Sequence, residues 1–150
     1  MRVTKVAFMA LGLASALAMA VPAAHATIAD QMTKLTFSRP VQIPGNKVLP
    51  AGTYWFQTLD NQALPNAVLI YNENRTRVEA TLLTEPAYRA KPQARTELAL
   101  AGGSRSRAPL LVKWFYPGSD YGHRFLYSAR TERQIREEGM RNVLAQPYSG

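Results

Sequence analysis

Hydrophobic and polar residues alternate in short runs along most of this chain. Leu35, Phe37, Val41 and Ile43 are separated mainly by polar residues, which is the two-residue period of a half-buried β-strand. Later runs either alternate in the same way or are continuously apolar, and both patterns are compatible with strands. The pattern predicts strands at residues 34–43, 53–59, 67–71, 75–84, 95–101, 110–116 and 123–128.

Proline, glycine and asparagine separate these runs, as expected for turns. Arg39 falls on the apolar register of the first run and is followed by Pro40, which cannot donate to a sheet ladder, so this pair indicates an edge or a bulge. About seven strands at a spacing of roughly ten residues are typical of an antiparallel β-sandwich or flattened barrel. We therefore expect an all-β domain over residues 27–130.

One helix is predicted, within a C-terminal segment that covers residues 131–150. Thr131 and Gln134 have the spacing of a capping box, and Pro147 lies beyond the expected end at residue 145. The apolar stripe of this helix is thin, and Gly139 interrupts it. We therefore expect a short helix that packs loosely on the β-domain or is partly disordered.

The first 26 residues have the pattern of a secretory signal peptide. Arg2 and Lys5 precede an apolar run at residues 6–21, and Ala24 and Ala26 are the small residues that a signal peptidase requires. Cleavage is predicted between Ala26 and Thr27, and an uncleaved membrane anchor is the alternative. The leader predicts export to the periplasm or the cell exterior. No second long apolar run follows, so the cleaved chain is not expected to be transmembrane.

The chain is basic, with a formal net charge of +8 that falls to +6 when Arg2 and Lys5 leave with the leader. A cationic surface favours anionic partners, and for an exported protein these include acidic polysaccharides and other envelope components. The same charge can also serve solubility alone. Both interpretations remain open at this stage.

Several kinds of catalytic chemistry are disfavoured. The chain has no cysteine and only two histidines, of which His123 alone lies beyond the leader, so we expect no metal site and no cofactor. Ser119, Asp120 and His123 fall in one predicted turn, whereas a hydrolytic triad normally draws on separate segments. We place His123 near the surface at the start of a strand. Nothing in the sequence sets two carboxylates opposite each other in a cleft, so no enzymatic activity is predicted.

Aromatic and basic residues are the best candidates for binding. Tyr54-Trp55-Phe56 and Trp114-Phe115-Tyr116 each place rings on both faces of a strand, so some of these rings could stack on sugars. Alternatively, both faces are buried. Two basic loops, at residues 89–91 and 105–107, add cations, and the leader disfavours nucleic acid as their partner. The binding residues predicted from these clusters and loops are Trp55, Arg105, Arg107, Lys113, Phe115, Tyr121 and Arg124.

Two groups of motifs carry a family resemblance. Residues 41–45 with 49–54 (VQIPG and LPAGTY), and residues 114–118 with 121–122 (WFYPG and YG), resemble a family of small secreted bacterial β-domain proteins of unknown function. The Leu-x-x-Gly-Thr-Tyr element alone is similar to one in prealbumin-like surface domains. The family has no established catalytic or ligand residue, so the resemblance assigns no role to any residue here.

Taken together, these features predict an exported, non-catalytic β-domain that binds an anionic envelope or extracellular polymer, or a secreted or periplasmic partner protein. A structural role through pairing at an open sheet edge is one alternative. A small hydrolase that acts through carboxylates is another. The oligomeric state is not predicted.

Overall fold

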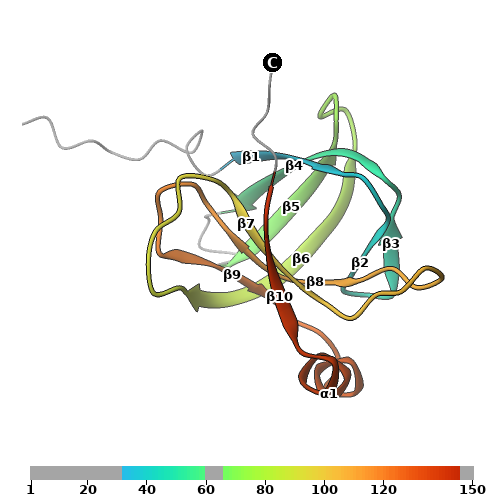
Figure 1. Ribbon diagram of the computed structural model, residues 1–150. Helices are drawn as coiled ribbons and strands as arrows, with labels where there is room; N and C mark the ends of the chain where they lie inside the picture. The colour runs from blue at the N-terminus through green and yellow to red at the C-terminus, as the bar shows by residue number, and fades with distance from the viewer. Residues whose placement is uncertain (1–31, 60–65, 146–150) are drawn as a thin grey trace, which may run out of the picture.

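The structure, a computed structural model, describes residues 32–59 and 66–145, so the predicted leader lies outside the described residues. The described chain forms a curved sheet and one helix (Figure 1). The strands are β1 (Met32–Phe37), β2 (Val41–Ile43), β3 (Lys47–Leu49), β4 (Gly52–Leu59), β5 (Ala67–Asn72), β6 (Val78–Tyr88), β7 (Glu97–Ala101), β8 (Leu110–Phe115), β9 (Tyr121–Phe125) and β10 (Met140–Leu144), and the helix is α1 (Ala129–Glu138).

The sheet has ten strands, and its main path runs β1-β4-β5-β6-β9-β8-β2-β3. β7 pairs with β8 and with β10, away from this path. All pairings are antiparallel except the short contact between β2 and β8, where Gln42 lies opposite Leu110. β1 pairs only with β4, β3 only with β2, and β10 only with β7, so these three strands are terminal in the described sheet, and β1 and β10 do not pair with each other.

The prediction of a mostly β domain with a short helix near its C-terminus is confirmed, but its details differ from the structure. About seven antiparallel strands were expected, whereas the structure adds three short strands and one parallel contact. Pro40 divides the first predicted strand into β1 and β2 because it cannot donate a backbone hydrogen bond. β3 lies where the sequence indicates only a connection between turns.

The core lies on the concave side of the sheet and is rich in aromatic rings. Phe56 packs edge-on against Trp114 at 5.5 Å between ring centroids, and against Phe125 at 6.4 Å. Alternate residues of β4 point into this core, so Tyr54 and Phe56 are buried while Trp55 between them faces outward. The outward position of Trp55 agrees with one ring of that cluster lying outside the core.

A bulge divides β8, so its apolar residues pack in two separate clusters. The register between β7 and β8 shifts in the middle of the two strands, and Val112 is the extra residue. Leu110 and Val112 therefore pack with Ile135 of α1 in a second small cluster. Trp114 lies in the main core.

The helix is shorter than predicted, and the residues after it form a strand. Ser128 caps α1 by accepting a hydrogen bond from the backbone of Thr131, so the predicted capping box at Thr131 is wrong. Gly139 ends the helix at a φ of 72°, a conformation that glycine adopts without steric cost. The following residues pair with β7 as β10, so this part of the C-terminal segment belongs to the sheet. No helix in the described part of the chain is long and apolar enough to cross a membrane.

Candidate functional site

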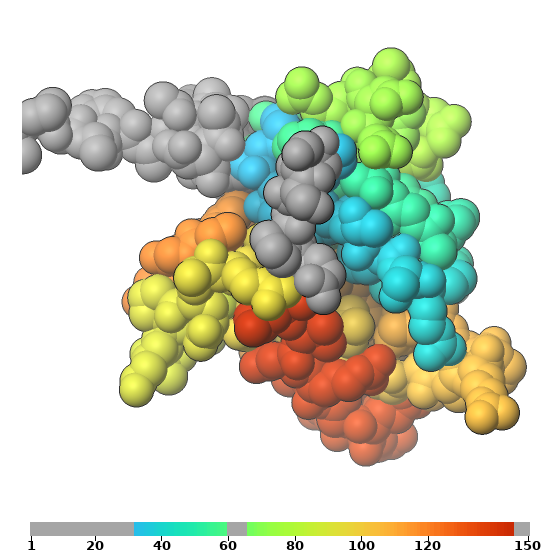
Figure 2. Space-filling model, turned by 45° about the horizontal axis from the view of Figure 1, so that its top comes forward, coloured from blue at the N-terminus to red at the C-terminus, as the bar shows by residue number. Residues whose placement is uncertain are grey.

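A pocket of about 400 Å³ separates the β1–β2 segment from β7 and β10. Figure 2 shows the segments around it, β1–β3 in cyan, the β7–β8 loop in orange and α1–β10 in red, meeting on one face. Leu35 and Val41 contribute from one side, and Leu98, Leu100 and Leu144 from the other. The pocket therefore lies where two terminal strands of the sheet, β1 and β10, approach each other without pairing.

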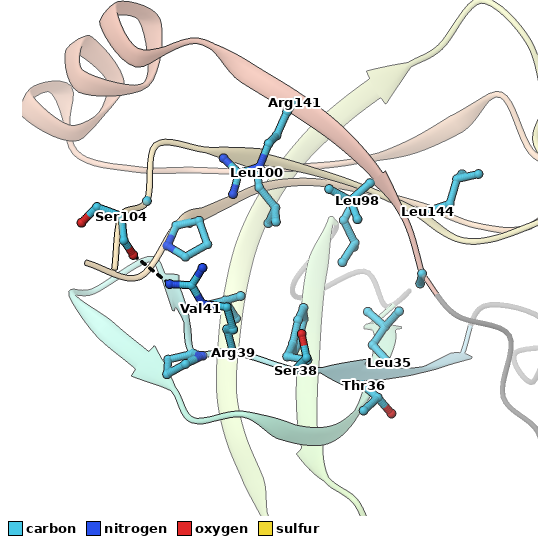
Figure 3. A pocket seen from close by; sticks show the side chains of 16 residues that line it. Leu35, Thr36, Ser38, Arg39, Val41, Leu98, Leu100, Ser104, Arg141 and Leu144 are labelled. Carbon is cyan, nitrogen blue, oxygen red and sulfur yellow. Dashed lines mark hydrogen bonds between the residues drawn. The ribbon is translucent and has the colours of Figure 1, made fainter. Parts of the chain in front are cut away.

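Two arginines stand at one end of this pocket. Arg39 follows β1, and its guanidinium donates to the carbonyl of Ser104 at 2.8 Å. Arg141 is the second residue of β10, and its guanidinium donates to the carbonyl of Gly102 at 2.6 Å. Figure 3 shows these polar groups on one side of the pocket and Leu98 with Leu144 on the other.

The charges of these arginines have no carboxylate partner. Neither guanidinium lies within 4.0 Å of an acidic side chain in the described part of the chain, and both donate to uncharged carbonyls instead. Many cations elsewhere are paired, namely Lys34, Lys47, Arg77, Arg89, Arg107 and Arg124. A guanidinium has five donors in a fixed plane and suits carboxylate or phosphate oxygens, so the pocket end can bind an anion.

The basic loop predicted from the sequence borders this pocket. Arg105 and Arg107 lie between β7 and β8, and a second hollow is lined by this loop together with Arg39. Arg107 forms an ion pair with Glu138 of α1 at 2.7 Å, which reduces its availability to a ligand. Arg105 is exposed and has no ion pair among the described residues. The structure thus brings both predicted arginines beside the pocket.

Three other predicted residues lie together on β8 and β9, away from this pocket. Lys113 and Arg124 face each other across the two strands. Arg124 also forms ion pairs with Glu85 at 3.3 Å and Glu132 at 2.6 Å. Phe115 is only 3% exposed, so the expectation of an outward, accessible ring at this position is wrong.

The burial of Phe115 has a clear packing reason. Its ring lies against Gly122, where an added Cβ would be 2.5 Å from the Cδ1 atom of Phe115. The guanidinium of Arg89 also lies over this ring, at 5.1 Å from its centroid. Arg89 is itself held by the carbonyls of Tyr116 and Ser119 at 2.8 Å each. The Phe115 ring is therefore buried because Gly122 leaves space beside it and Arg89 shields it from solvent.

The remaining two predicted aromatic residues lie in separate places. The Trp55 indole donates to the carbonyl of Glu73 at 2.8 Å, and the cations of Lys34 and Arg75 lie 5.7 and 5.2 Å from its ring centroid. Tyr121 is half-buried and packs edge-on against Tyr88 at 5.7 Å. The seven predicted residues therefore do not form one surface.

His123 is 4% exposed, so its predicted surface position is wrong. Its Nδ1 lies 3.0 Å from the hydroxyl of Thr84, and its Nε2 lies 3.0 Å from the hydroxyl of Tyr116. Thr84 donates to the carbonyl of Asn66 at 2.6 Å, so its oxygen accepts from Nδ1–H and the hydroxyl of Tyr116 donates to Nε2. Both ring nitrogens are occupied, and neither reaches Ser119 or Asp120 as a triad would need.

Burial keeps this network uncharged. It lowers the pKa of His123 to about 4 and raises the pKa of Tyr116 to about 12. At neutral pH both groups are therefore in the neutral forms that the hydrogen bonds require. The network is best explained as a buried polar element that fixes the packing of β6, β8 and β9.

Across residues 32–59 and 66–145, no group of three or more histidine, aspartate or glutamate side chains could hold a metal ion. No protein-family model, no curated protein and no solved structure matches this chain. The family resemblance drawn from the sequence motifs stays a prediction.

Sequence reasoning missed the two arginines of the pocket for different reasons. Arg39 carried a usable signal, because a charged residue on the apolar register before Pro40 indicated an irregular edge. Arg141 carried none, because it fell inside a segment predicted to be helical. Its position at the pocket depends on the turn at Gly139 and on the pairing of β10 with β7.

Proposed function

We propose that this protein is an exported, non-catalytic binding domain that captures an anionic envelope component at the pocket formed by β1–β2, β7 and β10. The observation that carries the proposal is the pair of arginines, Arg39 and Arg141, which line one pocket without a carboxylate partner in the described chain. Export follows from the predicted leader, and the basic charge of the chain favours the same class of ligand.

The two arginines would act as a clamp. Each is held in place by one hydrogen bond to a backbone carbonyl, which leaves further N–H donors for the oxygens of a ligand. Arg105 on the adjoining loop would add long-range attraction, because it is exposed and has no ion pair among the described residues. The ligand oxygens would belong to carboxylates or phosphates.

The first test is binding of polygalacturonate, an acidic polysaccharide, with dextran as the neutral polymer. We expect the double variant Arg39→Gln/Arg141→Gln to bind at least about tenfold more weakly, because it loses charge-assisted hydrogen bonds. Lys91→Gln/Arg133→Gln is the matched control, since it removes the same charge from two exposed side chains outside the pocket. Binding should also weaken as the Debye length falls from about 30 Å at 0.01 M salt to about 8 Å at 0.15 M.

Equal losses in the two double variants would show that net charge alone governs binding, and would contradict the pocket as the site. Polygalacturonate binding that is insensitive to salt would contradict electrostatic capture. If dextran binds as well as polygalacturonate, the anionic group is not what the protein recognises.

Assembly through a sheet edge is a second candidate function, supported by a different observation. Among the described residues, β1 pairs only with β4 and β10 pairs only with β7, so each has an edge without a strand partner. Met140, Val143 and Leu144 of β10 are 49%, 39% and 43% exposed, which adds apolar surface beside that edge. Such an edge can accept a strand from another chain.

Light scattering coupled to size-exclusion chromatography tests this second function. Edge pairing predicts a molar mass that rises with protein concentration, and Val143→Lys should abolish the rise because a lysine on an edge strand opposes pairing. Arg136→Lys on α1 is the control, since it changes an exposed side chain outside the sheet. A monomer mass at every concentration would exclude self-assembly by this route.

A further inference from the structure

Beyond its arginines, the pocket has leucine side chains in its walls that the binding of an anion alone does not explain. Its walls include Leu35 of β1, Leu98 and Leu100 of β7, and Leu144 of β10. Leu144 is 43% exposed, so a substantial part of its side chain is available to a ligand. Figure 3 shows Leu35, Leu98 and Leu144 gathered toward the end of the pocket opposite Arg39 and Ser104.

A ligand that matches this separation of apolar and cationic groups has a hydrocarbon part and an anionic part. A polysaccharide segment packed against these leucine side chains would place hydroxyl groups against surfaces that cannot hydrogen-bond to them, which is unfavourable. A hydrocarbon chain has no such groups, and its burial beside leucine side chains is favourable. The charged head of the same molecule would then reach the two arginines. The volume of about 400 Å³ lies within the range of roughly 300–1,000 Å³ found for small-molecule sites.

We propose that the pocket binds a single-chain amphiphile with an anionic head group, of the fatty-acid type, with its chain between β1 and β10 and its head at Arg39 and Arg141. This inference rests on the proposed function, because it uses the same arginines, and it adds the chemistry of the rest of the ligand. Two sources supply this chemistry, a free fatty acid and a lysophospholipid, since both present one hydrocarbon chain and an anionic head.

Calorimetric titration with dodecanoate, below the concentration at which it forms micelles, is the central experiment. We expect one molecule bound per protein, at least tenfold more tightly than octanoate, because each buried methylene adds roughly fourfold to the affinity. Arg39→Gln/Arg141→Gln should weaken dodecanoate binding by about tenfold and leave the binding of uncharged dodecanol unchanged.

The apolar wall is tested separately with Leu144→Gln, a change at a partly exposed side chain that the fold should tolerate. It should weaken dodecanoate binding severalfold, because a polar amide replaces part of the apolar wall. Leu83→Gln on β6 is the matched control, since Leu83 is 55% exposed and lies outside the pocket lining. Monomeric lysophosphatidylglycerol distinguishes the two sources: tighter binding of it than of dodecanoate identifies a lysophospholipid, and binding of dodecanoate alone identifies a free fatty acid.

Each adverse outcome has a distinct meaning. If the arginines bind polygalacturonate but dodecanoate binds no better than octanoate, the amphiphile is excluded and the proposed function stands. If Arg39→Gln/Arg141→Gln binds polygalacturonate and dodecanoate as tightly as Lys91→Gln/Arg133→Gln does, both the proposed function and the amphiphile proposal fail. In the sequence, residues 146–150 follow Ala145, which lines the pocket, so a variant that lacks them is included. If only that variant binds dodecanoate, this segment competes for the pocket and the amphiphile is not the resident ligand.

Discussion

Acidification from neutral pH to about pH 4 is expected to lower the free energy of unfolding by up to about 3 kcal/mol through His123 alone. In the folded protein, burial lowers the pKa of this imidazole from 6.5 to about 4. The unfolded chain therefore binds a proton between these two values that the folded protein does not bind. The stability from this group is fully present above pH 6.5 and is lost as the pH falls toward 4.

The structural reason is that a protonated ring does not fit the hydrogen bonds around it. The hydroxyl of Tyr116 donates to Nε2 of the neutral ring, and an imidazolium would place a second N–H against that donor. Urea unfolding at a series of pH values between 4.5 and 7 measures the effect. His123→Gln is the reference, because it keeps a polar side chain but does not titrate. The slope of the free energy of unfolding against pH is compared between the two proteins, because the constant loss of stability caused by the substitution itself does not affect that slope.

Equal slopes for the wild-type protein and His123→Gln over this pH range would contradict the assignment. An NMR titration of the His123 ring gives an independent reading. A midpoint near 6.5 in the folded protein would show that the ring is not held neutral by burial.

Replacing Ile135 by alanine is expected to destabilise the protein by about 2–4 kcal/mol, which is the range for removing a large buried aliphatic side chain. Ile135 is 2% exposed and is the one buried residue of α1. It packs with Leu110, Val112 and Ala101, in the cluster that the bulge in β8 creates. The substitution would leave a cavity beneath the helix and reduce the contact that holds α1 on the sheet.

Chemical denaturation of Ile135→Ala measures the loss, and Arg136→Ala is the control because its side chain is exposed on the same helix. We expect the control to lie within about 0.5 kcal/mol of the wild-type protein. Hydrogen exchange should show faster exchange of the α1 amides in Ile135→Ala. If both variants have the same stability, α1 is only loosely attached, as the thin apolar stripe of its sequence suggested.

The strands were predictable because local alternation determines which side chains enter the core. The runs that became β4, β5, β7, β8 and β9 carry their own hydrophobic pattern, so their positions follow from the sequence within a few residues. β10 could not be found in this way. Its residues have no strand alternation, all five are exposed, and the strand depends on its pairing with β7.

The candidate site was only partly predictable for the same reason. Arg105 and Arg107 were identified because a basic loop is a local feature. The pocket itself joins residues from β1, β7 and β10, whose proximity depends on the curvature of the whole sheet. Phe115 shows the converse, since no local pattern reveals that Arg89 and Gly122 bury its ring.

The most direct test of the central claim is an NMR titration that follows the guanidinium Nε–H signals while short oligogalacturonates are added. If an anion binds at the pocket, the signals of Arg39 and Arg141 should shift together and saturate, while that of Arg124, which is already paired with Glu85 and Glu132, should stay in place. Saturating shifts at Arg124 with none at Arg39 or Arg141 would contradict the account and place the anion site on β8–β9 instead.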